Sequence, residues 1–177
     1  YRYLDPENGI ISLNDYKKHH QNLDIDLFIV VDTNSLSRIG MEIQAIVQRS
    51  KNLLFIDHHP CAVELSKLHC IDTKFAATGE LIGLLIESLG ISFTKDMALP
   101  LYTAILIDTS SFRYPSVSGD THRIIAKLMD TGVRPSSAYN RIYGTKKLSH
   151  MRLVGRVLSN AKSNESGTVA WLTLDEK

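Results

Sequence analysis

Cysteine and long apolar runs are both scarce in this sequence. Only two of its 177 residues are cysteines, Cys61 and Cys70, which excludes a disulfide framework and favours reduced thiols in a cytoplasmic protein. The longest nearly apolar run, residues 97–107, is too short for a membrane span, which needs about 20 residues. The chain begins with Tyr1 rather than Met and without an apolar leader, and we expect it to be a piece of a longer protein.

The composition is that of a globular domain, but its charge is unevenly distributed. Hydrophobic residues make up 44% of the chain and charged residues 22%, with a net charge of +1. Residues 131–164 contain seven Lys or Arg and no Asp or Glu, whereas acidic residues are in excess before them. This pattern suits an anionic ligand held next to a cation-binding carboxylate cluster, although a solvated basic helix is the simpler explanation of the basic segment alone.

Short apolar runs alternate with helical patterns along the chain. Strands are predicted at residues 27–31, 53–56 and 68–71. Thr78 is predicted to cap one helix, and Pro100 to lie in the first turn of another. The alternation predicts an α/β fold with a parallel sheet flanked by helices on both faces. The predicted helices span residues 39–48, 80–89, 97–107, 121–129, 136–143 and 147–162, and a last strand at 168–174 follows a polar break at 163–167 that we interpret as a domain boundary.

Acidic residues and histidines follow these apolar runs. Asp32 and Asp57 each come directly after a predicted strand, His58 and His59 come next, and Asp108 ends the helix predicted at 97–107. The carboxyl ends of parallel strands meet at one edge of a sheet, so we expect these side chains to converge. Two carboxylates and an imidazole suit Mn²⁺ better than an all-oxygen Ca²⁺ site, and paired metal ions are how many hydrolases activate water.

Simpler explanations exist for several of these residues. Asp32 taken alone could equally be a helix N-cap, and His59 could be a structural histidine. His19 and His20 lie in a polar stretch and are expected to be exposed and inert. A zinc site is less favoured, because no two cysteines are spaced as Cys-x₂-Cys. Its ligands would come from His58, His59, Cys61, His69 and Cys70.

Several segments together resemble the DHH superfamily of phosphoesterases. Leu53-Leu54-Phe55-Ile56-Asp57-His58-His59-Pro60 resembles the signature of the family, and Val30-Val31-Asp32-Thr33 resembles its second motif. Ala77-Thr78-Gly79-Glu80-Leu81 resembles the segment that opens the next helix, and residues 101–114 resemble the fourth motif. The form Asp108-Thr109-x-x-Phe112 is most similar to the branch of NrnA-like oligoribonucleases and RecJ-like exonucleases.

The resemblance implies a role for each of these residues. Asp32 would bridge two Mn²⁺ ions, with Mg²⁺ as an alternative, and His58 and Asp108 would complete one of the two metal sites. His59 would contact the scissile phosphate or help to protonate the leaving group, and Asp57 would orient the histidines. Two arginines are weaker candidates for substrate binding: Arg38 would brace the loop of Asp32, and Arg113 would reach phosphate or lie on the surface.

The first motif of the family, an Asp-x-Asp on an earlier strand, has no counterpart in these residues. Asp24-x-Asp26 has the right letters but leads into the strand of the second motif. We expect the first motif to lie outside this chain or to be lost. The predicted organisation is a DHH domain without its first motif at 1–145, a linker helix at 146–165 and the first strand of a C-terminal substrate-binding domain at 166–177.

The basic segment gives a prediction about the substrate. The resemblance places a helix of this segment beside the substrate cleft, where Lys146, Lys147, Arg152 and Arg156 would hold phosphates. The run is short, which favours a short single-stranded oligonucleotide or a nucleotide over long duplex DNA. The predicted function is a manganese-dependent phosphoesterase, exonuclease-like and cytoplasmic. The alternative is a catalytically inactive DHH module that binds a nucleotide or a protein partner.

Overall fold

The computed structural model describes residues 2–61, 68–144 and 146–174. The chain divides into two compact units, Tyr1–Pro135 and Ser136–Lys177, which are described separately. Within the described part of the chain, every helix falls short of the length and apolar character needed to cross a bilayer.

The first unit contains a parallel sheet of three strands in the order β1-β2-β3. The strands β1 (Leu27–Val31), β2 (Asn52–Asp57) and β3 (Leu68–Ile71) confirm the three strands predicted for this part of the chain. Val30 of β1 is in register with Phe55 of β2, and both side chains are buried. Because the strands run parallel, the residues that follow β1 and β2 emerge at the same edge of the sheet.

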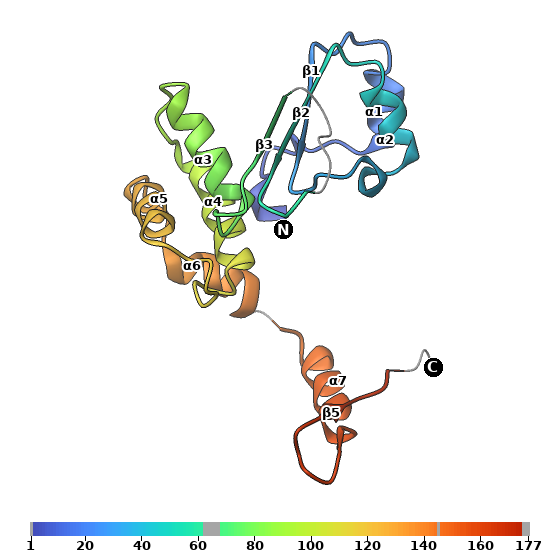
Figure 1. Ribbon diagram of the computed structural model, residues 1–177, viewed down its shortest axis with the longest axis vertical. Coiled ribbons are helices and arrows are strands. Elements are labelled where there is room, and N and C mark those ends of the chain that lie inside the picture. Colours follow the sequence, from blue (N-terminus) through green and yellow to red (C-terminus); the bar gives the residue numbers. More distant parts are fainter. Residues whose placement is uncertain (1, 62–67, 145, 175–177) are drawn as a thin grey trace. The chain divides into compact units, whose positions relative to one another are not determined.

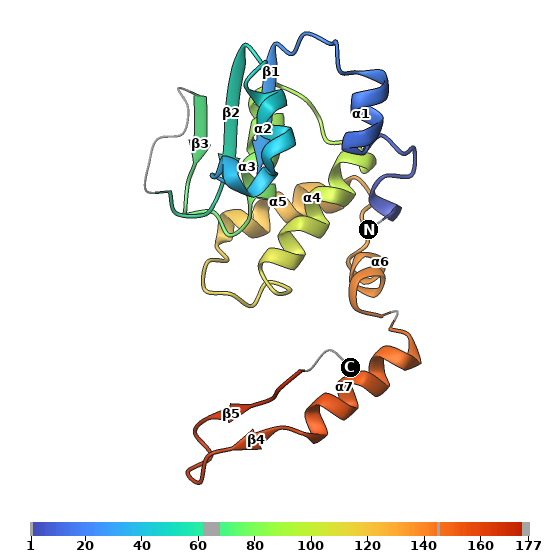
Figure 2. The same cartoon turned by 90° about the vertical axis from the view of Figure 1, so that its right-hand side faces the viewer.

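Helices cover both faces of this sheet, which confirms the predicted α/β class. The helices α1 (Leu13–His19) and α2 (Met41–Val47) lie on one side, and α3 (Thr78–Ser88) and α4 (Lys95–Asp108) lie on the other (Figures 1 and 2). The helix α5 (Gly119–Asp130) packs on α4 and α3. Phe55, Ile105 and Leu128 are fully buried, so the core runs from the sheet through the helical layer. The short 3₁₀ helices η1 (Arg2–Leu4) and η2 (Leu36–Ile39) complete the unit.

The sequence did not predict α1, and the starts of three helices near the candidate site differ from the prediction. The helix predicted at 39–48 is divided at Gly40, where a φ of +82° separates η2 from α2. The helix α4 begins at Lys95, because the hydroxyl of Thr94 caps it by accepting from the Met97 amide; Pro100 therefore lies inside the helix and not in its first turn. The N-cap of α3 is Ala77 and not Thr78, which leaves the Thr78 hydroxyl available for another partner.

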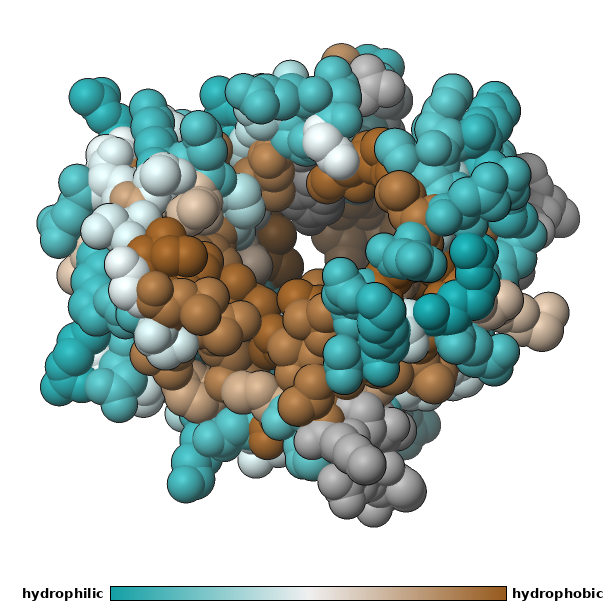
Figure 3. Space-filling model, turned by 90° about the horizontal axis from the view of Figure 1, so that it is seen from above, coloured by the Kyte–Doolittle hydropathy of each residue, from teal (hydrophilic) through white to brown (hydrophobic). Residues whose placement is uncertain are grey.

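One face of β1 is poorly covered within the described residues. Leu27, Ile29 and Val31 expose 43%, 46% and 51% of their surfaces, although parallel strands are normally buried on both faces. An apolar cavity of about 540 Å³ adjoins this strand and is lined by residues of η1, β1, α3 and α4. In the space-filling view of Figure 3, hydrophobic residues gather around a hollow.

The second unit consists of short helices and a hairpin. Its helical segments are α6, which begins one residue earlier (Pro135–Tyr139), the π-helix η3 (Asn140–Gly144) and α7 (Leu148–Ser159). The helix predicted at 147–162 ends at Ser159, and the residues after it form a hairpin in which β4 (Lys162–Ser163) pairs antiparallel with β5 (Ala170–Trp171). Only two residues of the strand predicted at 168–174 are in β5. The polar break at 163–167 runs from the last residue of β4 into the turn of this hairpin. The predicted domain limits remain predictions.

Candidate metal centre

Four of the predicted site residues emerge at one edge of the sheet. Asp57 is the last residue of β2 and is fully buried, and His58 and His59 follow it. Asp32 follows β1 with a φ of +62°, a left-handed conformation that Asp adopts more readily than most residues. One ligand atom from each of these four side chains lies within 4.8 Å of those of the others. The prediction that they converge is confirmed.

His58 stands between the two carboxylates predicted to bind metal with it. Its Nε2 lies 3.9 Å from Asp32 Oδ1 and 4.0 Å from Asp108 Oδ2. Its Nδ1 lies 3.3 Å from the Phe75 carbonyl oxygen, which can only accept, so Nδ1 is the donor there and Nε2 is the ring nitrogen left to bind a metal. Two ligands of one ion at about 2.1 Å each lie roughly 3–4 Å apart, so these distances suit a shared cation better than direct hydrogen bonds.

Asp57 organises the histidine loop. Its Oδ1 accepts from the backbone amides of His58 and His59 at 2.8 and 3.2 Å, and from Nδ1 of His59 at 2.8 Å. Its Oδ2 is buried and has no hydrogen-bond partner among the described residues. A buried carboxylate oxygen without a partner is costly, and a cation in this cluster would relieve that cost. The donor set and this unpaired oxygen therefore fit a divalent metal ion.

Asp108 adds negative charge to the same place from the end of α4. Burial raises the pKa of its carboxyl group, and the neighbouring carboxylate of Asp32 raises it further. His58 and His59 act in the opposite direction and offset part of this rise in the pKa of Asp108. A buried carboxyl group beside a second carboxylate makes a site that a cation would stabilise.

Sequence reasoning missed the part that the first turn of α3 plays at this site. The Thr78 hydroxyl donates to Asp32 Oδ1 at 2.9 Å, and Glu80 is a second buried polar residue of the same turn. The pattern Thr78-Gly79-Glu80 was the available signal. By itself this pattern predicts a helix start, because a threonine before a helical pattern usually caps it.

The remaining predicted site residues lie elsewhere or have other partners. Arg38 is exposed in η2. Arg113 donates from Nε and Nη2 to the carbonyl and hydroxyl oxygens of Ser110, at 2.7 and 2.8 Å, and so braces its own turn. The residues proposed to hold phosphates are exposed in the second unit: Lys146, Lys147, Arg152 and Arg156. The group of metal-ligating side chains found among the described residues includes none of Cys61, His69 and Cys70.

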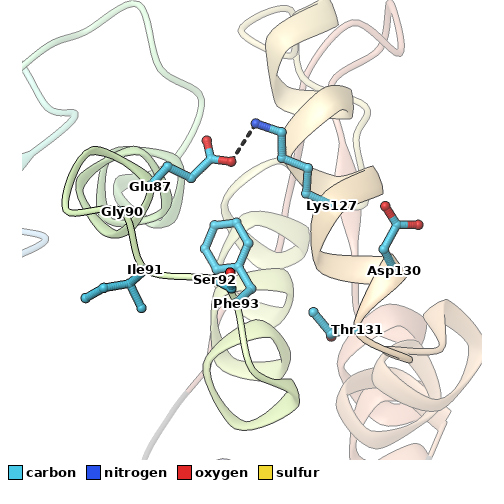
Figure 4. A pocket seen from close by; sticks show the side chains of 8 residues that line it. All are labelled: Glu87, Gly90, Ile91, Ser92, Phe93, Lys127, Asp130 and Thr131. Atoms are coloured by element: carbon cyan, nitrogen blue, oxygen red, sulfur yellow. Dashed lines mark hydrogen bonds and ion pairs between the residues drawn. The ribbon is translucent and has the colours of Figure 1, made fainter.

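Another concave region lies away from this centre, between the end of α3 and α5 (Figure 4). Glu87 of α3 and Lys127 of α5 form an ion pair across it at 2.6 Å, with Phe93 between the two helices. The carboxylate and the ammonium group satisfy each other, and no predicted site residue lines this pocket.

The fold and the cluster define an α/β domain with a candidate metal site at the carboxyl edge of a parallel sheet. No family model matches the chain. A bifunctional oligoribonuclease and PAP phosphatase, NrnA, of Thermus thermophilus is 30% identical over 149 residues, which cover 84% of this chain and 44% of that protein. Protein MG371 of Mycoplasma genitalium is 33% identical over 141 residues, which cover 80% of this chain and 42% of that protein.

A solved structure agrees with these relatives. The crystal structure of an exopolyphosphatase-related protein from Bacteroides fragilis matches with a TM-score of 0.88 and 28% identity, over 98% of this chain and 52% of that one. The chain thus spans about half the length of the proteins it matches. It belongs to the DHH superfamily of phosphoesterases.

Proposed function

We propose that the whole protein is a divalent-metal-dependent phosphoesterase that acts with Mn²⁺ on short oligonucleotides or nucleotides. The observation that carries this proposal is the convergence of Asp32, His58 and Asp108, with distances of 3.9 and 4.0 Å between their ligand atoms. Two carboxylates and one neutral imidazole suit Mn²⁺, and Mg²⁺ is an alternative.

The three converging side chains would hold the metal through one ring nitrogen and two carboxylate groups. His58 would bind through Nε2, because its Nδ1 proton is directed to the Phe75 carbonyl. Asp32 and Asp108 would bind through the carboxylate oxygens that face His58. A bound ion of this kind lowers the pKa of a coordinated water and neutralises charge on a phosphoryl group.

His59 and Asp57 would move and hold a proton beside the metal. Asp57 Oδ1 accepts from Nδ1 of His59, which fixes the tautomer and leaves Nε2 to exchange a proton with the reacting group. The side chain of His59 is 49% exposed, so a phosphate can reach it, whereas the side chain of Asp57 is 1% exposed. This division suits a proton donor to a leaving oxygen and a buried group that orients it.

The substrate class is inferred from charge and from one relative. The name of the Thermus thermophilus relative records an oligoribonuclease and PAP phosphatase. In the second unit, Arg152 and Arg156 lie four residues apart on α7, so they share a face of that helix. We propose that this face, with Lys146 and Lys147 before the helix, binds the phosphates of a short single strand.

Hydrolysis and metal binding can be tested with one pair of variants. Asp108→Ala is expected to abolish phosphodiester hydrolysis by the whole protein and to weaken Mn²⁺ binding measured by calorimetry. Asp130→Ala is the matched control, because Asp130 is the last residue of α5 as Asp108 is of α4, and it is exposed. Hydrolysis retained by Asp108→Ala would refute the proposal. A wild-type protein that binds nucleotide but does not hydrolyse it with Mn²⁺ would support the binding-module alternative.

A further inference from the structure

The carboxylate of Asp32 is held by a residue from a distant part of the chain. The side chain of Asp32 is 57% exposed, and solvent alone would leave it free to change rotamer. The Thr78 hydroxyl, on a residue that is 5% exposed, donates to Asp32 Oδ1 at 2.9 Å. Among the described residues, the structure gives this carboxylate no other hydrogen bond. The oxygen that Thr78 holds is also the one that faces His58 Nε2.

The turn that carries Thr78 is itself fixed on two sides. A Cβ at Gly79 would lie 3.1 Å from Ile105 Cγ1 and 3.3 Å from Ala104 Cβ, so the absence of a side chain lets α3 approach α4 closely. Glu80, 2% exposed, accepts from the Ala76 amide at 2.9 Å and from the Thr121 hydroxyl at 3.1 Å. Thr78 therefore presents its hydroxyl from a rigid support and not from a mobile loop.

The same turn supports the imidazole of His58. The Ala76 amide that Glu80 holds follows directly on the Phe75 carbonyl, which accepts from His58 Nδ1. Two of the three proposed metal ligands, Asp32 after β1 and His58 after β2, thus form hydrogen bonds with the start of α3 and the loop before it. Groups of this kind, which touch the ligands and not the metal, commonly change metal affinity when they are altered.

We propose that Thr78 is a positioning residue, whose hydroxyl fixes the Asp32 carboxylate in the orientation that binds the metal. This inference rests on the proposed metal site at Asp32, His58 and Asp108. Thr78 does not bind the ion: its hydrogen bond occupies one lone pair of Oδ1 and leaves the other lone pair and Oδ2 for coordination. Loss of the hydroxyl should leave the fold in place and release the carboxylate to its other rotamers.

The experiment is Mn²⁺ binding by calorimetry on three threonine variants, with thermal unfolding as a check on the fold. Thr78→Val is expected to weaken Mn²⁺ binding by about 10- to 100-fold, the usual effect of removing such a partner. Thr78→Ser keeps the hydroxyl and should bind within a few-fold of wild type. Thr103→Val is the matched control, because Thr103 is 1% exposed and, among the described residues, its hydroxyl donates to the Leu99 carbonyl of its own helix and to no other group.

A double variant separates positioning from a general structural effect. If Thr78 acts through Asp32, Thr78→Val should weaken Mn²⁺ binding no further in the Asp32→Ala background. Equal Mn²⁺ affinity in Thr78→Val and wild type, or equal loss in Thr78→Ser and Thr78→Val, would overturn the inference and leave the proposed function standing. A wild-type protein that binds no Mn²⁺ would overturn the proposed function, and the inference with it.

Discussion

Removing the Asp57 carboxylate tests how far the histidine loop depends on a single buried acceptor. Asp57→Ala deletes the oxygen that accepts from the two backbone amides and from the His59 ring. Asp57→Asn keeps an acceptor in the same place and removes the charge. The two variants therefore separate the loss of hydrogen bonds from the loss of a buried negative charge.

The expected size of each effect follows from the burial of these groups. Hydrogen bonds to a charged acceptor contribute about 1.5–3 kcal/mol, but the side chain of His59 is half exposed and its ring nitrogen can turn to water. Loss of the three hydrogen bonds then lowers the free energy of unfolding by about 4–5 kcal/mol, and removal of the unpaired buried Oδ2 raises it by about 2 kcal/mol. Asp57→Ala should thus destabilise the metal-free protein by about 2–3 kcal/mol, and Asp57→Asn should stay within about 1 kcal/mol of wild type.

Urea unfolding of the metal-free protein measures both values, provided that the slope of the transition is unchanged. Asp26→Ala is the control, because Asp26 is exposed and forms a surface pair with Lys51; its expected cost is about 0.5 kcal/mol or less. If Asp57→Asn destabilised the fold as much as Asp57→Ala, the charge and not the acceptor would hold the loop, and the reasoning would be wrong.

Four further predictions follow from other parts of the chain. Asp108→Asn should raise the melting temperature of the metal-free protein near neutral pH while Mn²⁺ binding is lost, because burial and the Asp32 carboxylate raise the pKa of Asp108 and so make its ionised form unfavourable in the folded state. Burial likewise raises the pKa of the Glu80 carboxyl group from its usual 4.5. The protonated carboxyl group therefore stabilises the fold below pH 4.5, and this stabilisation is lost as the pH rises through the pKa of the folded state. Glu80→Gln should flatten this decline when unfolding is measured as a function of pH. Ser111→Gly should stabilise the protein by about 1 kcal/mol in urea unfolding, because Ser111 has a φ of +64°; a destabilised variant would contradict this. Arg152→Glu together with Arg156→Glu should raise KM for oligonucleotides in the whole protein, and unchanged kinetics would exclude α7 as a phosphate-binding face.

The strands and the residues at their ends could be predicted because their signals are local. Runs such as 27–31 and 53–56 are apolar without interruption and end at Asp32 and Asp57, and parallel pairing alone brings those ends together. Asp108 also follows an apolar run, but it ends the helix α4, so its place beside Asp32 was implied by the resemblance to the family and not by strand pairing.

The contacts that hold these side chains were not predictable, because they join distant residues that have a local alternative. Thr78 and Asp32 are 46 positions apart, and a threonine at a helix start has capping as its usual partner. The left-handed turn at Ser110, Ser111 and Phe112 contains no glycine, so no residue type indicates it. It forms because the buried Thr109 hydroxyl accepts from the Phe112 amide, a contact that only the folded helix end provides.

The arrangement of the site also links metal binding to the stability of the fold. Asp32 and Asp108 come from different elements, and burial followed by repulsion from Asp32 raises the pKa of Asp108, so ionisation of Asp108 opposes folding without metal. A cation bound by both carboxylates would offset this repulsion. Binding to the folded state alone stabilises a protein by about 2.7 kcal/mol at a hundredfold excess over Kd. If the proposed metal site is correct, the hydrogen bonds with Thr78, Phe75 and Asp57 would hold its ligands in an arrangement that is costly without metal and favourable once a cation is bound.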